Sequence, residues 1–213
     1  MLGALYERAL DGQRCWIRRD DGQACILPVA RWLGGREADE SFDGSVVDMC
    51  VGPTIELGCG PGRLIEMLSR RGIPALGVDQ SATAIRLARL RGAPVVHGDV
   101  FAPLPQTGYW QTVLLADGTI GLDGDPVRIL TRAAQLLAPG GCCIAEFEPD
   151  AGGVRTGWVR LESADAVGPW FRWAWVGIDS AAVVATQAGL AVTDIHTFNQ
   201  RIVANLTKPL VPA

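Results

Sequence analysis

From residue 53 onward, short apolar runs alternate with segments of helical periodicity, and few folds accommodate such a chain. Strands separated by helices pair in parallel, because each helix returns the chain to the edge of the sheet from which the strand began. The pattern therefore predicts an α/β domain built on a parallel sheet. Its strands are expected at residues 54–57, 75–78, 94–96, 112–116 and 142–147.

Local capping signals place helices between these strands. Residues 63–71 carry apolar side chains on one helical face and are followed by a glycine, a typical C-terminal stop. Ser81 is a good N-cap for the helix after the second strand, and Asp125 followed by Pro126 begins another helix. Segment 101–111 is rich in proline and glycine, so we expect no regular helix there.

After Pro149 the alternation weakens. An aromatic insertion spans residues 150–178, a helix is expected at 179–188, and two strands that should pair antiparallel follow at 190–198 and 202–206. The complete pattern predicts a doubly wound, mostly parallel seven-stranded sheet with helices on both faces and an antiparallel C-terminal strand.

The chain divides into an N-terminal extension and a core. Residues 1–50 precede the alternating pattern and contain a hairpin signal, with short apolar runs at 15–17 and 24–27 around an Asp-Gly turn. Residues 51–213, which include the insertion, make the Rossmann-like core. A length of 213 residues fits one domain with an appendage better than two full domains.

Charge and cysteine usage narrow the class of partners. The chain carries 19 basic and 23 acidic side chains, so neither nucleic acid nor an anionic membrane is an expected partner. The six cysteines form no Cys-x-x-Cys pair and neither histidine has zinc spacing, so we expect no metal and interpret the cysteines as small hydrophobic residues. No signal peptide and no membrane span are evident. We expect a cytoplasmic protein.

The sharpest motif is Glu56-Leu-Gly58-Cys-Gly60-Pro-Gly62, between the first strand and the first helix. Glycines allow a tight turn and a close approach of ligand to backbone, and the helix N-terminus beyond favours an anionic group. A dinucleotide loop would place its third glycine at position 63, which is Arg63 here. Glu56 would repel a pyrophosphate but suits a ligand that carries an ammonium group.

This motif resembles the E/D-x-G-x-G-x-G loop of the class I, Rossmann-fold S-adenosylmethionine-dependent methyltransferases. The resemblance extends over about residues 53–148 and includes the Leu-Ala-Pro-Gly-Gly turn before the fifth strand. It implies that Asp79, which lies 21 residues after Gly58, takes the ribose hydroxyls, and that Asp99 and Val100 contact adenine. It further implies that residues 116–118 hold the methionine end and the methyl acceptor.

The S-adenosylmethionine site implied by this resemblance comprises Glu56, Gly58, Cys59, Gly60, Gly62, Asp79, Gln80, Asp99, Val100, Ala116, Asp117 and Gly118. The implied reaction is direct in-line transfer of the methyl group to a small-molecule acceptor. Because the sulfonium already activates the methyl group, the protein needs chiefly to align the reactants and exclude water.

Aromatic residues gather in the two segments that usually form the acceptor site of this fold. We expect the N-terminal extension and the insertion to make a lid, with Trp16, Trp32, Trp170 and Trp173 as acceptor-site residues. Such rings would also suit a cationic acceptor. Alternatively, these rings pack the lid onto the sheet.

No catalytic base is assigned from the sequence. A base is needed only if the acceptor loses a proton during transfer, and the candidates are His97, Asp117, Asp123 and His196. Each also has a structural interpretation: a packing residue at a strand end, a ligand of the cofactor amino group, or a surface residue.

The motifs of two other classes of methyltransferase are missing from the sequence. Asp117-Gly-Thr-Ile stands where amino-methyltransferases of adenine or glutamine carry Asn/Asp-Pro-Pro-Tyr, and no Pro-Cys pair of the cytosine C5 enzymes is present.

Two alternative functions stay open. An NAD-linked oxidoreductase shares the fold, although its glycine spacing differs. A non-catalytic protein that binds S-adenosylmethionine for regulation is the second alternative.

Overall fold

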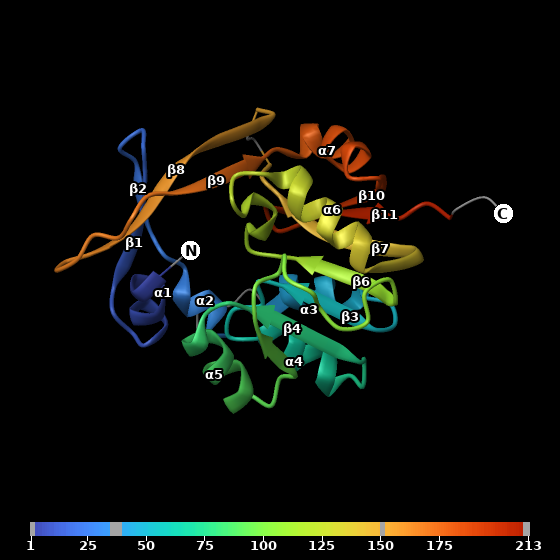
Figure 1. Ribbon diagram of the computed structural model, residues 1–213, viewed down its shortest axis with the longest axis horizontal. Coiled ribbons are helices and arrows are strands. Elements are labelled where there is room, and N and C mark those ends of the chain that lie inside the picture. The colour runs from blue at the N-terminus through green and yellow to red at the C-terminus, as the bar shows by residue number, and fades with distance from the viewer. Residues whose placement is uncertain (1–2, 35–39, 150–151, 211–213) are drawn as a thin grey trace.

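The computed structural model describes residues 3–34, 40–149 and 152–210, and these contain two β-sheets (Figure 1). The larger sheet has the strand order β10-β11-β7-β6-β3-β4-β5. Its strands are β3 (Thr54–Leu57), β4 (Ala75–Asp79), β5 (Val95–His97), β6 (Trp110–Leu115), β7 (Leu137–Phe147), β10 (Ala191–Phe198) and β11 (Arg201–Thr207).

The pairing of the larger sheet confirms the predicted topology. Strands β3, β4, β5, β6 and β7 pair in parallel, and β11 runs antiparallel to both β7 and β10. All four residues of β3, an interior strand of the sheet, are buried. A strand covered on both faces is expected to be mostly apolar, and this is why short apolar runs predicted the sheet correctly. The buried polar residues Thr54 and Glu56 are the exceptions in β3.

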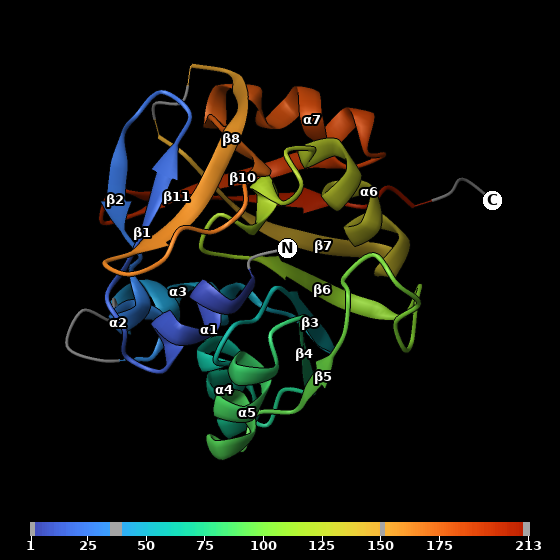
Figure 2. The same cartoon turned by 60° about the vertical axis from the view of Figure 1, so that its left-hand side comes forward.

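Helices cover both faces of this sheet (Figure 2). The core on one face contains side chains of α3 (Glu40–Met49), α4 (Arg63–Arg70) and α5 (Ala82–Leu90), and the core on the other contains α6 (Pro126–Leu136) and α7 (Ala181–Gln187). The Ser81 hydroxyl accepts a hydrogen bond from the Ala84 amide, and the Asp125 carboxylate accepts one from the Arg128 amide, as the capping signals predict. Helix α3 belongs to the segment assigned to the extension, yet it packs into this core.

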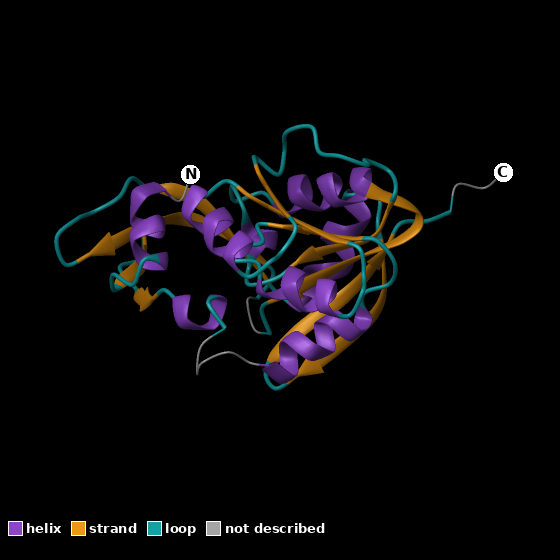
Figure 3. Ribbon diagram, turned by 90° about the horizontal axis from the view of Figure 1, so that it is seen from below, coloured by secondary structure: helices purple, strands orange, loops and turns teal. Residues whose placement is uncertain are grey.

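The smaller sheet joins the N-terminal hairpin to the insertion after β7. Its order is β2 (Ala24–Ile26), β1 (Cys15–Arg19), β8 (Val154–Ser163) and β9 (Phe171–Val176), all antiparallel. In Figure 1 it extends beside the larger sheet, above the N-terminal helix α1 (Gly3–Leu10) and α2 (Val29–Trp32). Figure 3 shows the molecule from below, with its helices and strands in separate colours. The hairpin was predicted, whereas β8 and β9 were not. Residues 150–151 of the insertion lie outside the described residues.

Four of the six cysteines are buried and Cys142 is half-buried, as expected of small hydrophobic residues, and one is exposed. Cys15, Cys50, Cys59 and Cys143 are buried, whereas Cys25 is exposed on β2, at the edge of the smaller sheet. Within the described ranges no helix is long and apolar enough to cross a membrane. The same ranges contain no group of three or more His, Cys, Asp or Glu side chains able to hold a metal ion.

The contact of the glycine loop with β4 should be sensitive to a single added carbon. A Cβ on Gly77 would lie 2.6 Å from the Cys59 sulfur, so Gly77→Ala should lower the free energy of unfolding by about 1–3 kcal/mol through overpacking. Urea denaturation measures this change. Gly44→Ala in α3 is the control: its Cβ meets nothing within 4 Å, and it should stabilise the protein by up to about 1 kcal/mol. Equal stability of Gly77→Ala and wild type would contradict this packing.

Candidate functional site

A cavity of about 350 Å³ opens at the carboxyl ends of β3, β4 and β6, where parallel α/β sheets bind ligands. Both sheets contribute walls to it, together with α1 and the loop that leads to α2. Its lining comprises Tyr6, Ile17, Leu27, Pro28, Trp32, Glu56, Gly58, Cys59, Gly60, Pro61, Arg63, Asp79, Gln80, Gly98, Asp99, Val100, Phe101, Asp117, Gly118, Thr119, Leu122, Asp123, Leu161 and Trp173.

The glycine loop forms one wall and has no room for a side chain at Gly58 or Gly62. Gly58 has a φ of 73°, and a Cβ there would lie 2.8 Å from the Thr119 side chain. Gly62 has a φ of 77°, and its Cβ would lie 2.8 Å from that of Ala88. Gly62 does not line the cavity. It lies just before α4, where the chain packs closely against helix α5. Ala116 is buried at the end of β6 and also lies outside the lining.

Asp79 ties the glycine loop to the end of β4. Its carboxylate accepts hydrogen bonds from the Gly60 amide at 2.9 Å and from the Ser81 amide at 2.8 Å. The side chain is 8% exposed, and burial raises its pKa. Each carboxylate oxygen can accept a second hydrogen bond, so Asp79 can also meet a diol in the cavity.

The residues expected around adenine lie on the turn after β5 and beside it. Asp99 is exposed, and its carboxylate accepts a hydrogen bond from the Phe101 amide at 2.9 Å. Val100 is buried, and Gln80 is exposed at the end of β4. All three line the same cavity as Asp79.

Glu56 is the one cavity carboxylate with an unsatisfied buried oxygen. It is 3% exposed on β3, and its Oε2 has no hydrogen-bond partner among the described residues. Burial raises the pKa of Glu56 well above its usual value. Arg63 opposes this shift, while Asp117, Asp43 and Asp79 add to it. A buried acceptor without a partner, facing a cavity, is the group that an ammonium-bearing ligand would satisfy.

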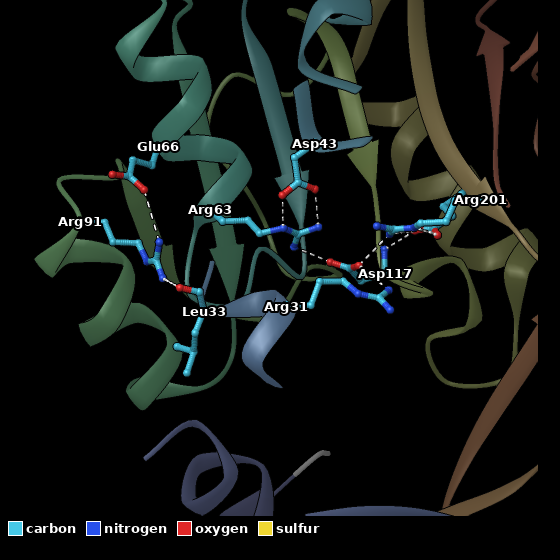
Figure 4. Close-up of polar contacts among 9 residues, drawn as sticks. Arg31, Leu33, Asp43, Arg63, Glu66, Arg91, Asp117 and Arg201 are labelled. Carbon is cyan, nitrogen blue, oxygen red and sulfur yellow. Dashed lines mark hydrogen bonds and ion pairs between the residues drawn. The ribbon is translucent and has the colours of Figure 1, made fainter. Parts of the chain in front are cut away.

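Asp117 is held by arginines from three different elements (Figure 4). Its carboxylate accepts hydrogen bonds from Arg63 Nη1 at 2.5 Å and from Arg201 Nη2 at 2.9 Å, and Arg31 Nη1 lies 4.0 Å away. Its own amide donates to Glu146 at 2.7 Å. With both carboxylate oxygens engaged by guanidinium groups, Asp117 is fixed in place rather than free to take a proton from an acceptor.

Sequence reasoning missed the arginines of this network. Arg63 donates to both carboxylate oxygens of Asp43, at 2.8 and 3.0 Å, besides its bond to Asp117. Arg201 donates to both oxygens of Glu146 at 2.7 Å. The one available signal was Arg63 itself, which stands where a dinucleotide loop would need glycine.

The four expected acceptor-site tryptophans fall into two groups. Trp32 and Trp173 line the cavity. Trp16 does not, because side chains alternate along β1 and its neighbour Ile17 is the one that faces the cavity. Trp170 is also outside it, 40% exposed under the Arg160 guanidinium, which lies 4.6 Å from its ring centre. The cavity thus brings together two of the four, Trp32 and Trp173, and the acceptor-site role of the four tryptophans stays a prediction.

The candidate bases are placed unfavourably for proton transfer. His97 lies outside the cavity lining with its Nε2 3.0 Å from the Gln80 carbonyl oxygen. His196, on β10, stacks on Phe198 and is also remote from the lining. Asp123 lines the cavity but forms an ion pair with Arg128 at 2.8 Å. The structure thus gives no reason to assign a base.

The donors and acceptors of the cavity fit S-adenosylmethionine. The orphaned oxygen of Glu56 fits the ammonium group, the free lone pairs of Asp79 fit the ribose hydroxyls, and the glycine loop leaves backbone exposed where side chains would block a ligand. A volume of about 350 Å³ lies within the usual range for cofactor pockets.

Comparisons with known proteins agree with this fit. Residues 55–141 match the family model of a methyltransferase domain. The trans-aconitate 2-methyltransferase of Paracidovorax citrulli is 31% identical over 146 residues, 64% of this chain and 52% of that protein. That of Rhizobium leguminosarum is 27% identical, over 54% of this chain and 45% of that protein. The chain thus spans about half the length of the curated relatives it matches.

Solved structures show the same fold over nearly the whole chain. A methyltransferase of Bacteroides fragilis in complex with S-adenosylhomocysteine has a TM-score of 0.77 at 19% identity and covers 98% of this chain and 94% of that one. The 1,6-didemethyltoxoflavin N1-methyltransferase of Burkholderia thailandensis has a TM-score of 0.63 at 17% identity, covering 93% and 97%. Residues 55–141 are thus similar to a methyltransferase domain, and the chain has the fold of these solved S-adenosylmethionine-dependent methyltransferases.

Proposed function

We propose that this protein transfers the methyl group of S-adenosylmethionine to a small-molecule acceptor. The observation that carries the proposal is the unpartnered, buried oxygen of Glu56 in a cavity that also contains the glycine loop and Asp79. When bound, the cofactor supplies a methyl group already activated by a sulfonium. The protein therefore has to bind, orient and exclude water rather than provide a strong nucleophile.

Each part of the cavity has a role in this proposal. Glu56 pairs with the ammonium group of the methionine end, and Gly58, Gly60 and Gly118 let the backbone approach it. Asp79 receives the ribose hydroxyls while it holds the loop, and Asp99, Val100 and Gln80 surround the adenine. Gly62 and Ala116 act as packing residues beneath these contacts.

The acceptor would lie against the wall that the smaller sheet and α2 provide. Ile17, Leu161 and Trp173 come from that sheet, and Leu27 and Trp32 from the chain that follows it. These side chains are apolar or aromatic, so they favour a small acceptor with an apolar body. The small size of the acceptor is further supported by relatives named trans-aconitate 2-methyltransferase and by a structural neighbour with bound 1,6-didemethyltoxoflavin.

S-adenosylhomocysteine should stabilise the protein, and NAD should not. At about 100 times its dissociation constant, a ligand that binds only the folded state adds about 2.7 kcal/mol, which raises the Tm by about 5–10 °C for a chain of this size. A thermal-shift assay with both compounds at equal concentration measures this difference. A shift with NAD alone would instead support the oxidoreductase.

The affinity for S-adenosylhomocysteine should rise with pH and depend on Glu56. Burial raises the pKa of Glu56, so the carboxyl must lose a proton before it pairs with an ammonium group, and more of it is ionised as pH increases. Calorimetric titration between about pH 5 and 8 should show this increase. Glu56→Gln should bind about ten-fold or more weakly and lose most of the pH dependence.

The exposed Glu148 provides a control for that experiment, since Glu148→Gln should bind as wild type does. The smaller pH dependence that remains in Glu56→Gln is assigned to Asp79, whose pKa burial also raises. Affinity that falls as pH rises would refute the assigned role of Glu56.

Methyl transfer should depend on Trp173 but not on Trp170. With methyl-labelled S-adenosylmethionine and a small-molecule extract of the host, the wild-type protein should label at least one low-mass compound. Trp173→Ala removes part of the cavity wall and should lower this labelling about ten-fold or more without weakening S-adenosylhomocysteine binding. Trp170→Ala, outside the cavity, should keep both. Binding without any labelling in the wild type would favour the non-catalytic alternative.

A further inference from the structure

Tyr6 brings a buried phenol from the N-terminal helix into the cofactor cavity. It lies on α1 and is 7% exposed. Its neighbours in a small apolar core include Leu5, Ala9, Leu10, Ala84 and Leu161, which belong to α1, α5 and β8. Helix α1 is thereby fixed against both the larger domain and the smaller sheet, and the position of the Tyr6 ring is fixed with it.

The Tyr6 hydroxyl stands over the glycine loop. A Cβ placed on Gly60 would lie 3.4 Å from the Tyr6 oxygen. Burial raises the pKa of Tyr6 well above 10, and the nearby Asp79, Cys59 and Asp117 raise it further, so the phenol keeps its proton and remains a hydrogen-bond donor. Among the described residues no hydrogen bond to this hydroxyl is found, although the group is polar and lines the cavity.

The ring of Tyr6 also contacts the acceptor side of the cavity. Trp32 of α2 meets it edge to face, with ring centres 5.8 Å apart and an interplanar angle of 63°. Both rings line the cavity. Tyr6 thus lies between the glycine loop and the wall proposed for the acceptor.

We propose that Tyr6 is a cofactor-binding residue supplied by the N-terminal helix: its hydroxyl hydrogen-bonds S-adenosylmethionine above the glycine loop, and its ring supports Trp32 beside it. The proposal rests on the proposed function, because it assumes that this cofactor occupies the cavity. It assigns α1 a direct part in binding. A helix far from the glycine motif in sequence then contributes to the cofactor site beside Gly60.

Tyr6→Phe tests this role by removing one oxygen and keeping the ring. Calorimetric titration with S-adenosylhomocysteine should give a dissociation constant about five- to ten-fold larger than that of wild type, the loss expected for one hydrogen bond. The Tm of the ligand-free variant should not fall, since no hydrogen bond within the described structure is lost. Tyr109→Phe is the matched control: Tyr109 is the second of the two tyrosines, is 75% exposed, and should leave the dissociation constant unchanged.

The outcomes separate this inference from the proposed function. Equal dissociation constants for Tyr6→Phe and wild type would overturn the inference while the proposed function stands. Weaker binding accompanied by a lower Tm of the ligand-free variant would also overturn it, because the hydroxyl would then serve the fold. If the wild-type protein does not bind S-adenosylhomocysteine at all, the proposed function fails first.

Discussion

The ion pairs of the Arg63 guanidinium hold together the elements on which the cavity is built. The guanidinium is 7% exposed and joins Asp43 of α3 to Asp117 at the end of β6, while belonging itself to the first turn of α4. A buried charge is tolerated only when it is paired, so each member of this set requires the others. Because Asp117 also binds Arg201 of β11, one carboxylate fixes the relative positions of a central strand, a helix and the antiparallel C-terminal strand. The glycine loop and the cavity are built on that fixed frame.

Short stretches of sequence were sufficient to predict the larger sheet and its helices. They were not sufficient to predict the smaller sheet, because its pairing joins distant parts of the chain. The capping residues Ser81 and Asp125 bond to amides three residues further along, and the glycine loop and Asp79 have a characteristic spacing, so their roles can be recognised in sequence. Strands β8 and β9 show no such signal: they carry arginines and tryptophans on surfaces that are partly exposed, and β1, the second partner of β8, lies far away in the chain. No short window contains the information that β8 pairs with β1.

The same distinction explains what the sequence alone could not place within the site. Trp16 was chosen for its aromatic ring, but the side of β1 on which it lies depends on a strand register that involves pairing with β8, far along the chain. Arg63 was noticed as a departure from a glycine pattern, yet its partner Asp43 is 20 residues away on a helix that sequence analysis did not identify. Tyr6 gave no signal as a site residue beyond being aromatic, because its place over Gly60 follows from how α1 packs.

The pairing of β1 with β8 has a consequence for how the protein is made. Asp20, just after β1, bonds to the Trp158 amide 138 residues further along the chain. During synthesis from the ribosome, the N-terminal hairpin therefore emerges early and keeps an unpaired edge until most of the core has been translated. Such an edge can join another nascent chain, and contacts this distant in sequence form late in folding. The smaller sheet is thus completed only after most of the larger sheet has been translated.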